Sequence, residues 1–251
     1  MGHTISIAMP AHREMGNLEG AVNYVSDELE FLSKTGKIDD WEIIIVDSLE
    51  KDGSTDGTPQ LADRLAKTNS RIRVIHNDNY VNLGCKYIQA LSKAGFDYFM
   101  MVPGKNTLHG ASLKNLLGNI PENGIVVGYQ DDMSRRPFKR RAVSKVFTIF
   151  MNSVFGLRLR YYNGTTVIPT QILRELNPDI EDFAYMADIL VTILKRYRLT
   201  YVQIPFYTKG IRSYGKTKAT EWKNIISVAR TILRLIAKIY FRKGGLIEKS
   251  G

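Results

Sequence analysis

Four polar segments of this chain each follow a short apolar run, and they carry side chains that could bind a ligand. The segments are residues 10–14, 47–56, 77–82 and 103–106. Carboxylates and amides within them can accept hydrogen bonds, and a lysine can offset the negative charge of a phosphate. Asp47 stands out because it directly follows a β-branched run. As an alternative, Asp47 is a carboxylate that caps a turn or a helix.

Basic side chains dominate the charge, because 35 Lys and Arg face 25 Asp and Glu and leave a formal net charge of +10. This excess favours a polyanionic partner, which could be a nucleic acid, an anionic lipid or a phosphate-bearing substrate. Four arginines lie close together beside Phe138, namely Arg135, Arg136, Arg140 and Arg141. We interpret this arginine cluster as a contact to phosphates or lipid headgroups, with a solvated surface run as the alternative.

The elements that must position these residues alternate between strands and helices. Apolar runs predict buried strands, and apolar spacing of three to four residues predicts helices. The predicted strands span residues 5–9, 42–47, 72–75, 98–102, 124–129 and 200–204. The predicted helices span residues 16–32, 58–67, 83–94, 142–155, 183–195 and 222–243. This alternation indicates an α/β fold around a mostly parallel sheet, in which ligands bind beyond the carboxyl ends of the strands.

Motifs at these strand ends resemble those of the inverting glycosyltransferases of family 2. Pro10 to Glu14 is similar to the opening Pro-Ala-Tyr-Asn-Glu of that family. Ile44 to Asp47, followed by Asp52 to Thr58, is similar to its Val-Val-Asp-Asp-Gly-Ser-Thr-Asp-Gly-Thr, with an insertion around residues 49–51. Asn82-Leu83-Gly84 and Phe96-Asp97-Tyr98 continue the match in order. Arg212 to Lys218 resembles the Arg-x-x-Gly-x-Ser-Lys segment of dolichyl-phosphate mannose synthases.

The resemblance implies a GT-A fold, a Rossmann-like domain that binds a nucleotide-diphospho-sugar donor. It implies a glycosyltransferase domain at residues 1–220, with a nucleotide-sugar half at 1–120 and an acceptor half at 121–220, followed by an amphipathic segment at 221–251. In this reading Asp47 accepts hydrogen bonds from the N–H groups of a uracil or guanine ring. The implied donor-binding residues are Pro10, His12, Glu14, Asp47, Asp56, Asn82, Gly104, Arg212 and Lys218.

One position departs from the family pattern. The family usually places Asp-x-Asp after the fourth strand, where it holds a divalent metal, whereas this chain reads Pro103-Gly104-Lys105-Asn106. A protonated lysine cannot ligate a metal, and Mg²⁺ prefers carboxylates. We therefore expect weak or absent dependence on Mg²⁺ or Mn²⁺, with Lys105 and Asn106 as catalytic candidates and Lys105 stabilising the departing diphosphate. Alternatively, the chain binds a divalent metal and Asp97 or Asp131 is one of its ligands.

The acceptor-binding residues are also inferred from resemblance to the family. A bacterial group of the family with Pro-Gly-Asp-Asn and a Tyr-Tyr-Asn-Gly turn is most similar, and that turn includes Asn163. Likeness to the dolichyl-phosphate mannose synthases implies a lipid-linked acceptor such as a polyprenyl phosphate, bound by Asn163 and the arginine cluster. An anionic phosphate nucleophile needs little help from a base. Asp188 is still a catalytic candidate, beside Glu181 and Asp182, although all three could instead complement a helix dipole.

Residues 222–243 combine a basic stripe, at Arg230, Arg234, Lys238 and Arg242, with an apolar face. This pattern is typical of an amphipathic helix at a membrane surface, and the alternative is packing on the domain or on a partner subunit. No run reaches the roughly 18 apolar residues of a spanning helix. We expect a cytoplasmic protein associated peripherally with the cytoplasmic face of an anionic membrane. The single cysteine, Cys85, is expected in the core.

Three other functions remain open on the sequence alone. The first is transfer to a diacylglycerol lipid or a polysaccharide, and the second is a non-catalytic glycosyltransferase-like protein. The third is nucleic-acid binding, which we do not expect because the arginines follow neither an RNP-like nor a helix-turn-helix pattern.

Overall fold

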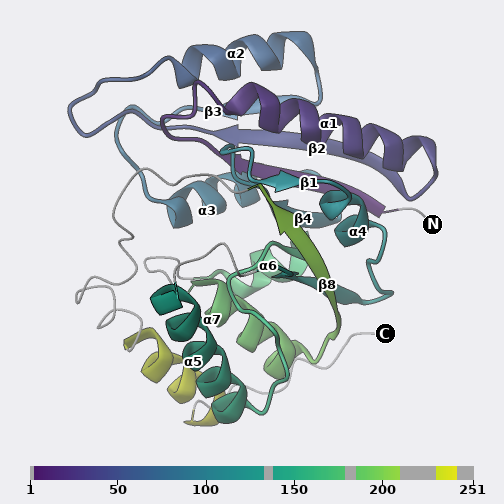
Figure 1. Cartoon of the computed structure of the whole chain (residues 1–251), viewed down its shortest axis with the longest axis vertical. Helices are drawn as coiled ribbons and strands as arrows, with labels where there is room; N and C mark the ends of the chain where they lie inside the picture. Colours follow the sequence, from purple (N-terminus) through teal and green to yellow (C-terminus); the bar gives the residue numbers. More distant parts are fainter. Residues whose placement is uncertain (1–2, 133–137, 179–184, 210–229, 242–251) are drawn as a thin grey trace.

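An eight-stranded mixed sheet forms the centre of the molecule, in the order β3-β2-β1-β4-β7-β6-β8-β5 (Figure 1). The computed structural model describes residues 3–132, 138–178, 185–209 and 230–241. The strands are β1 (His3–Pro10), β2 (Ile38–Val46), β3 (Ile72–Ile75), β4 (Tyr98–Met101), β5 (Leu108–His109), β6 (Gly124–Gln130), β7 (Thr166–Pro169) and β8 (Thr200–Thr208).

The strand directions bring several carboxyl ends to one edge of the sheet. β1 pairs in parallel with β2 and β4, and β2 pairs in parallel with β3. Ile43 to Val46 of β2 are fully buried between two neighbouring strands, which explains why that run is wholly apolar. β7 is antiparallel to both β4 and β6. β6 therefore points the same way as β1, β2 and β4, and all four end at the same edge.

Helices cover both faces of the sheet and enclose two apolar cores. One face carries α1 (Leu18–Lys34), α2 (Thr58–Thr68) and α4 (Ser112–Leu117), with Leu29 and Leu113 in its core. The other carries α3 (Leu83–Lys93), α5 (Phe138–Phe155), α6 (Thr170–Leu176) and α7 (Tyr185–Thr192), with Phe99 and Tyr162 in its core (Figure 1). α7 continues into the π-helix η1 (Ile193–Tyr197), and residues 230–236 into η3 (Ala237–Phe241).

The predicted fold class is confirmed, and most predicted elements lie within a few residues of their positions. Four short elements were not predicted, namely β5, α4, β7 and α6. α5 begins at Phe138 rather than at residue 142. Of the predicted helix at 222–243, the structure describes only residues 230–241, which are helical. The expectation of a core cysteine was wrong, because Cys85 is exposed and its neighbour Lys86 faces inward instead.

Among the described residues, no helix combines the length and the apolarity that crossing a bilayer requires.

Candidate active site

The loops that follow β1 and β4 are held together at the carboxyl edge of the sheet. Ala11 N donates to Val46 O at 2.9 Å, and Gly104 N donates to Pro10 O at 3.0 Å. A Cβ on Gly104 would lie 3.2 Å from a methyl carbon of Leu18 and 3.3 Å from Pro10 O, so glycine permits this close approach. Pro10 and Gly104, both predicted to bind the donor, are therefore neighbours.

Asp47 follows β2 at this edge and is only 1% exposed. Its Oδ2 lies 2.8 Å from Nδ1 of His76, and its backbone oxygen accepts a hydrogen bond from Nδ2 of Asn77 at 2.8 Å. Burial raises the pKa of Asp47, although the charges of His76 and Lys86 oppose it. Its Oδ1 is buried and has no hydrogen-bond partner in the described part of the chain. A buried acceptor in this state is costly, so Oδ1 is a natural partner for a ligand N–H group.

His76 belongs to the same cluster and was missed by the sequence reasoning. It directly follows β3, and its Nε2 lies 3.0 Å from Oδ1 of Asp63 on α2. Burial lowers the pKa of His76, but its contacts with Asp63 and Asp47 outweigh burial, so the pKa is raised overall. His76 thus links an exposed carboxylate to a buried one. The signal in the sequence was a titratable residue at a predicted strand end.

Lys86 is a second member that sequence reasoning missed. It lies on the inner side of α3 and is only 3% exposed. Its Nζ donates to the backbone oxygen of Ala11, and it interacts electrostatically with Asp47 and Glu14. Burial lowers the pKa of Lys86 to about 8 in spite of these two carboxylates. A lysine in such a place is costly to bury, which is typical of a functional site.

Glu14 completes the buried cluster from the loop after β1. Its Oε2 accepts a hydrogen bond from Nδ2 of Asn17 at 2.8 Å, and its backbone N donates to Oγ1 of Thr58 at 2.8 Å. Burial raises the pKa of Glu14, while Asn17 and the charge of Lys105 lower it. The predicted donor residues Glu14 and Asp47 therefore share one charged cluster with Lys86.

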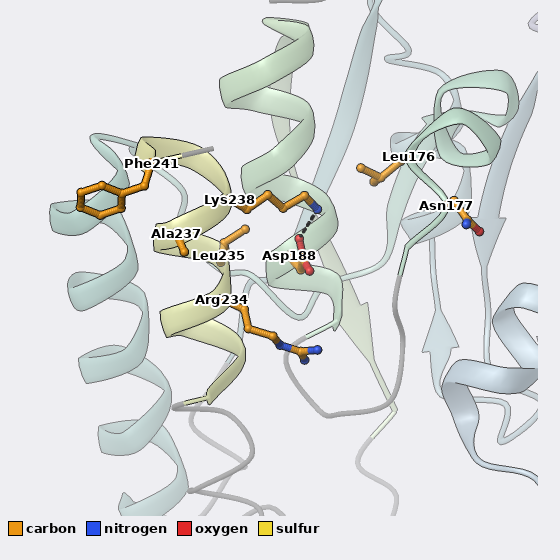
Figure 2. A pocket seen from close by; sticks show the side chains of 8 residues that line it. All are labelled: Leu176, Asn177, Asp188, Arg234, Leu235, Ala237, Lys238 and Phe241. Atoms are coloured by element: carbon orange, nitrogen blue, oxygen red, sulfur yellow. Dashed lines mark hydrogen bonds and ion pairs between the residues drawn. The ribbon is translucent and has the colours of Figure 1, made fainter. Parts of the chain in front are cut away.

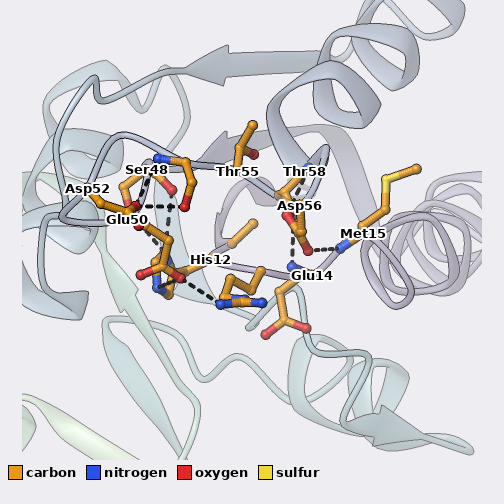
Figure 3. A network of polar contacts seen from close by, with 12 residues as sticks. His12, Glu14, Met15, Ser48, Glu50, Asp52, Thr55, Asp56 and Thr58 are labelled. Carbon is orange, nitrogen blue, oxygen red and sulfur yellow. Dashed lines mark hydrogen bonds and ion pairs between the residues drawn. The ribbon is translucent and has the colours of Figure 1, made fainter.

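Asp56 anchors the loop between β2 and α2 (Figure 3). Its Oδ1 accepts hydrogen bonds from N and Oγ1 of Thr58, at 3.1 and 2.6 Å, and its Oδ2 accepts one from Met15 N at 3.1 Å. Burial raises the pKa of Asp56, but these hydrogen bonds outweigh it and lower the pKa overall. The contacts describe a clamp between two loops, and donor contact by Asp56 stays a prediction.

The aromatic rings of His12 and Tyr80 contact each other beside the buried cluster. The His12 ring meets the Tyr80 ring edge-on, with ring centroids 5.2 Å apart. Figure 3 shows the other contact of His12, whose Nε2 lies 3.4 Å from Oε1 of Glu50. Asn82 caps α3, since its side chain accepts a hydrogen bond from Cys85 N at 2.8 Å. These predicted donor residues border the same strand-end region.

The loop after β4 presents a cation where the family pattern has carboxylates. Lys105 is exposed, and its charge acts on Glu14. Asn106 has a left-handed backbone, with φ of 54°, and its Oδ1 accepts a hydrogen bond from Nζ of Lys209 at 2.9 Å. Within residues 3–132, 138–178, 185–209 and 230–241, no group of three or more His, Cys, Asp or Glu could hold a metal ion.

Asp97 cannot serve as the alternative metal ligand of this site. It precedes β4, and its Oδ2 accepts a hydrogen bond from Oγ1 of Thr4 at 2.8 Å, near the start of β1. Asp97 therefore lies at the opposite edge of the sheet from Lys105. Asp131 follows β6 at the carboxyl edge and is exposed.

Asp188 lies in a separate cavity of about 660 Å³, between α7 and residues 230–241 (Figure 2). Its Oδ1 accepts hydrogen bonds from Oγ1 of Thr192 at 3.0 Å and from Nζ of Lys238 at 3.1 Å. Leu176, Asn177 and Arg234 also line this cavity. The contacts tie Asp188 to the C-terminal helix, and a catalytic role for it stays a prediction.

Of the predicted acceptor residues, the structure describes the side chains of Arg141 and Asn163. Arg141 lies over the Phe138 ring, with its guanidinium carbon 5.9 Å from the ring centroid, and lines a groove of about 450 Å³ between α5 and residues 159–161. Asn163 is exposed on the turn before β7. The other predicted residues lie outside the described residues, namely Arg135, Arg136, Glu181, Asp182, Arg212, Lys218 and the side chain of Arg140.

Comparison with known proteins shows the family and the fold of this chain. The family described as Glycosyl transferase family 2 matches residues 6–181, which is most of the chain. Glycosyltransferase AglD of Haloferax volcanii is 24% identical over 239 residues. That match covers 93% of this chain and 37% of AglD, so this chain spans well under half the length of that relative.

Two solved structures are similar in fold. The mannosyltransferase PcManGT from Pyrobaculum calidifontis, in complex with GDP-Man and Mn²⁺, superposes with a TM-score of 0.64 at 14% identity, covering 93% of this chain and 65% of that chain. The glucosyl-3-phosphoglycerate synthase of Mycobacterium tuberculosis, in complex with Mn²⁺, UDP-glucose and phosphoglyceric acid, has a TM-score of 0.63 at 18% identity, covering 94% and 79%.

Proposed function

Because this chain belongs to glycosyl transferase family 2, we propose that it transfers a sugar from a nucleotide-diphospho-sugar to a lipid-linked acceptor, with inversion at the anomeric carbon. The observation that carries the proposal is the buried Asp47 carboxylate, whose Oδ1 has no partner in the described part of the chain. A uracil or guanine ring supplies the N–H group that this oxygen needs. Residues 1–120 then form the nucleotide-sugar half, and residues 121–220 the acceptor half.

The donor lies along the carboxyl edge of the sheet in this proposal. PcManGT and the glucosyl-3-phosphoglycerate synthase, which share the fold, bind GDP-Man and UDP-glucose. Asp47 contacts the base, and Glu14 and Pro10 line the base and ribose pocket. Lys86 positions the site, because its Nζ donates a hydrogen bond to the Ala11 carbonyl and its charge attracts the carboxylates of Asp47 and Glu14.

The diphosphate leaving group needs positive charge as its bond to the sugar breaks. Both structural neighbours were solved with Mn²⁺. In this chain the described residues after β4 do not fit a divalent metal, because Lys105 and Asn106 stand where carboxylates would be needed. Lys105 supplies the charge instead, with Arg212 and Lys218 as further donor-binding residues.

The acceptor is a polyprenyl phosphate in this proposal. An anionic phosphate oxygen of the acceptor attacks the anomeric carbon from the face opposite the diphosphate. A new C–O bond forms as the bond between the sugar and the diphosphate breaks, and the electron pair leaves with the nucleoside diphosphate. The attacking oxygen carries no proton, so no general base is required. A hydroxyl acceptor, as in a diacylglycerol lipid or a polysaccharide, would need a base, and Asp188 is the candidate.

A thermal-shift series with UDP-sugars and GDP-sugars tests the proposal. A ligand at a hundred times its dissociation constant stabilises a protein by about 2.7 kcal/mol, which is readily measured. We expect Asp47→Asn to lose this stabilisation. Both carboxylate oxygens of Asp47 accept hydrogen bonds, whereas the asparagine amide can place its NH₂ group, a donor, opposite the N–H donor of the base. Glu42→Gln is the matched control, since Glu42 is a buried carboxylate in the middle of β2 that accepts a hydrogen bond from Gly95 N, before the start of β4. A full donor-induced shift in Asp47→Asn would contradict the assignment.

A further inference from the structure

The face of α5 that is turned away from the sheet is apolar and exposed. Val143, Val146, Ile149 and Phe150 are 59%, 67%, 56% and 46% exposed, whereas Met151 of the same helix is fully buried. Their spacing of three and four residues places them on one side of the helix. Isolated exposed apolar side chains are common, but a row of four on one helix marks a contact surface. We name these four residues the outer face of α5.

The C-terminal helix lies against α5 and adds to the apolar exposure. The ring of Tyr240 stacks on Phe155 at a centroid distance of 6.1 Å, and its hydroxyl donates to Val154 O at 2.6 Å. Leu233 and Phe241 of this helix are exposed. Two neighbouring helices thus present large apolar side chains to solvent.

Charge decides what kind of partner fits the outer face of α5. Neither α5 nor residues 230–241 contain an Asp or a Glu, while the two stretches together contain seven basic residues: Lys139, Arg140, Arg141, Lys145, Arg230, Arg234 and Lys238. The acid that pairs with Lys238 is Asp188, which comes from α7. If a second copy of this chain bound here through the same surface, its basic side chains would repel these basic side chains. An anionic bilayer offers negatively charged headgroups for the basic side chains and an apolar interior for the exposed apolar side chains.

The groove between α5 and residues 159–161 supports the same partner. It is lined by the cations Arg141, Lys145 and Arg160, and also by Ile149 of the outer face. An anionic headgroup above an acyl chain has this combination of charge and apolar surface. α5 also begins shortly after β6, whose carboxyl end lies at the edge of the candidate active site.

We propose that the outer face of α5 is the surface by which this protein docks on an anionic phospholipid bilayer. Val146, Ile149 and Phe150 enter the boundary between headgroups and acyl chains, and Lys145 contacts lipid phosphates. The proposal rests on the proposed function, since a membrane-bound acceptor is what docking serves. It goes beyond the basic stripe predicted for the C-terminal helix, because it assigns the apolar contact to α5.

Flotation of the full chain with vesicles tests this surface directly. The vesicles are phosphatidylcholine with about 30% phosphatidylglycerol, compared with phosphatidylcholine alone. We expect the wild type to float with the anionic vesicles, and Phe150→Asp to lower its partition coefficient about tenfold or more. Phe31→Asp is the matched control, because Phe31 is 49% exposed on α1, on the other face of the sheet, and we expect it to float like the wild type. Lys145→Gln should weaken binding mainly at low salt.

Each outcome decides for or against the surface. Wild type that stays with the soluble protein overturns the proposal, as does Phe150→Asp that floats like Phe31→Asp. A Phe150→Asp variant that only converts a dimer to a monomer, with flotation unchanged, identifies a self-association surface and also overturns it. Donor-induced thermal shifts measured without vesicles separate this result from the proposed function. A protein that binds donor but does not float keeps the function and loses the docking surface.

Discussion

Replacing Lys86 with methionine should stabilise the protein at pH 7 and weaken donor binding. Burial lowers the pKa of Lys86 from 10.5 to about 8. Each pH unit between these two pKa values is worth about 1.4 kcal/mol, so burying the charged form costs about 3 kcal/mol at pH 7. Methionine avoids this cost but gives up the hydrogen bond to Ala11 O, worth about 1 kcal/mol. We expect the variant to be about 2 kcal/mol more stable than the wild type.

The advantage of Lys86→Met should shrink as pH rises. Below about pH 8 the lysine is protonated in both the folded and the unfolded chain, so the wild type carries the full cost. Between about pH 8 and 10.5 the unfolded chain keeps the proton and the folded chain loses it, so the wild type gains stability with pH. From pH 7 to pH 9.5 the difference between the two proteins should fall by about 2 kcal/mol. Groups that do not interact with Lys86 titrate equally in both proteins and cancel, whereas Asp47 loses the charge of Lys86 in the variant.

Urea denaturation followed by circular dichroism at these two pH values measures both quantities. Lys93→Met is the control, because Lys93 is exposed on the same helix. The donor-induced thermal shift of Lys86→Met should correspond to roughly tenfold weaker binding, about 1.4 kcal/mol. If Lys86→Met loses about 3 kcal/mol or more at pH 7, and the loss does not depend on pH, Lys86 is a stabilising ion-pair partner and the reasoning is refuted.

Three further predictions concern other residues of the site and its frame. Activity should survive exhaustive chelation, because we propose that Lys105 supplies the charge at the diphosphate, and recovery with Mn²⁺ after a loss would mean that another residue set binds a metal. Gly164→Ala should destabilise by about 3 kcal/mol or more in urea, since its Cβ would lie 1.8 Å from Gly128 O; an unchanged midpoint would contradict this. Asp56→Ala should lower the melting temperature through three lost hydrogen bonds, far more than Asp52→Ala, and equal effects of the two would argue against the clamp.

Long apolar runs made the centre of the fold predictable. The β-branched run Ile43 to Val46 predicted a buried parallel strand, and the alternation with helices then predicted at which edge of the sheet a ligand would bind. The short β7 was missed because its four residues precede α6 directly and leave no turn signal between the two elements. Only tertiary pairing with β4 and β6 makes this segment a strand.

Residues of the candidate site were predictable where they follow a strand. They were not predictable on a helix, where the orientation of the helix decides which side chains face the site. Asp47 and Glu14 were found by their place at strand ends. His76 was missed although it also follows a strand, because a histidine there matched no motif. Lys86 was missed because helical spacing around it allows two orientations of α3, and the structure turns Lys86 inward and Cys85 outward.

The most direct test of the central claim is sugar transfer itself. The full chain, a nucleotide sugar and a polyprenyl phosphate in detergent are incubated with chelator, and the products are identified by mass spectrometry. We predict a glycosylated polyprenyl phosphate of inverted anomeric configuration, one nucleoside diphosphate released for each sugar transferred, and no product with Asp47→Asn. Failure to transfer sugar from any UDP-sugar or GDP-sugar, or undiminished transfer by Asp47→Asn, would contradict the account.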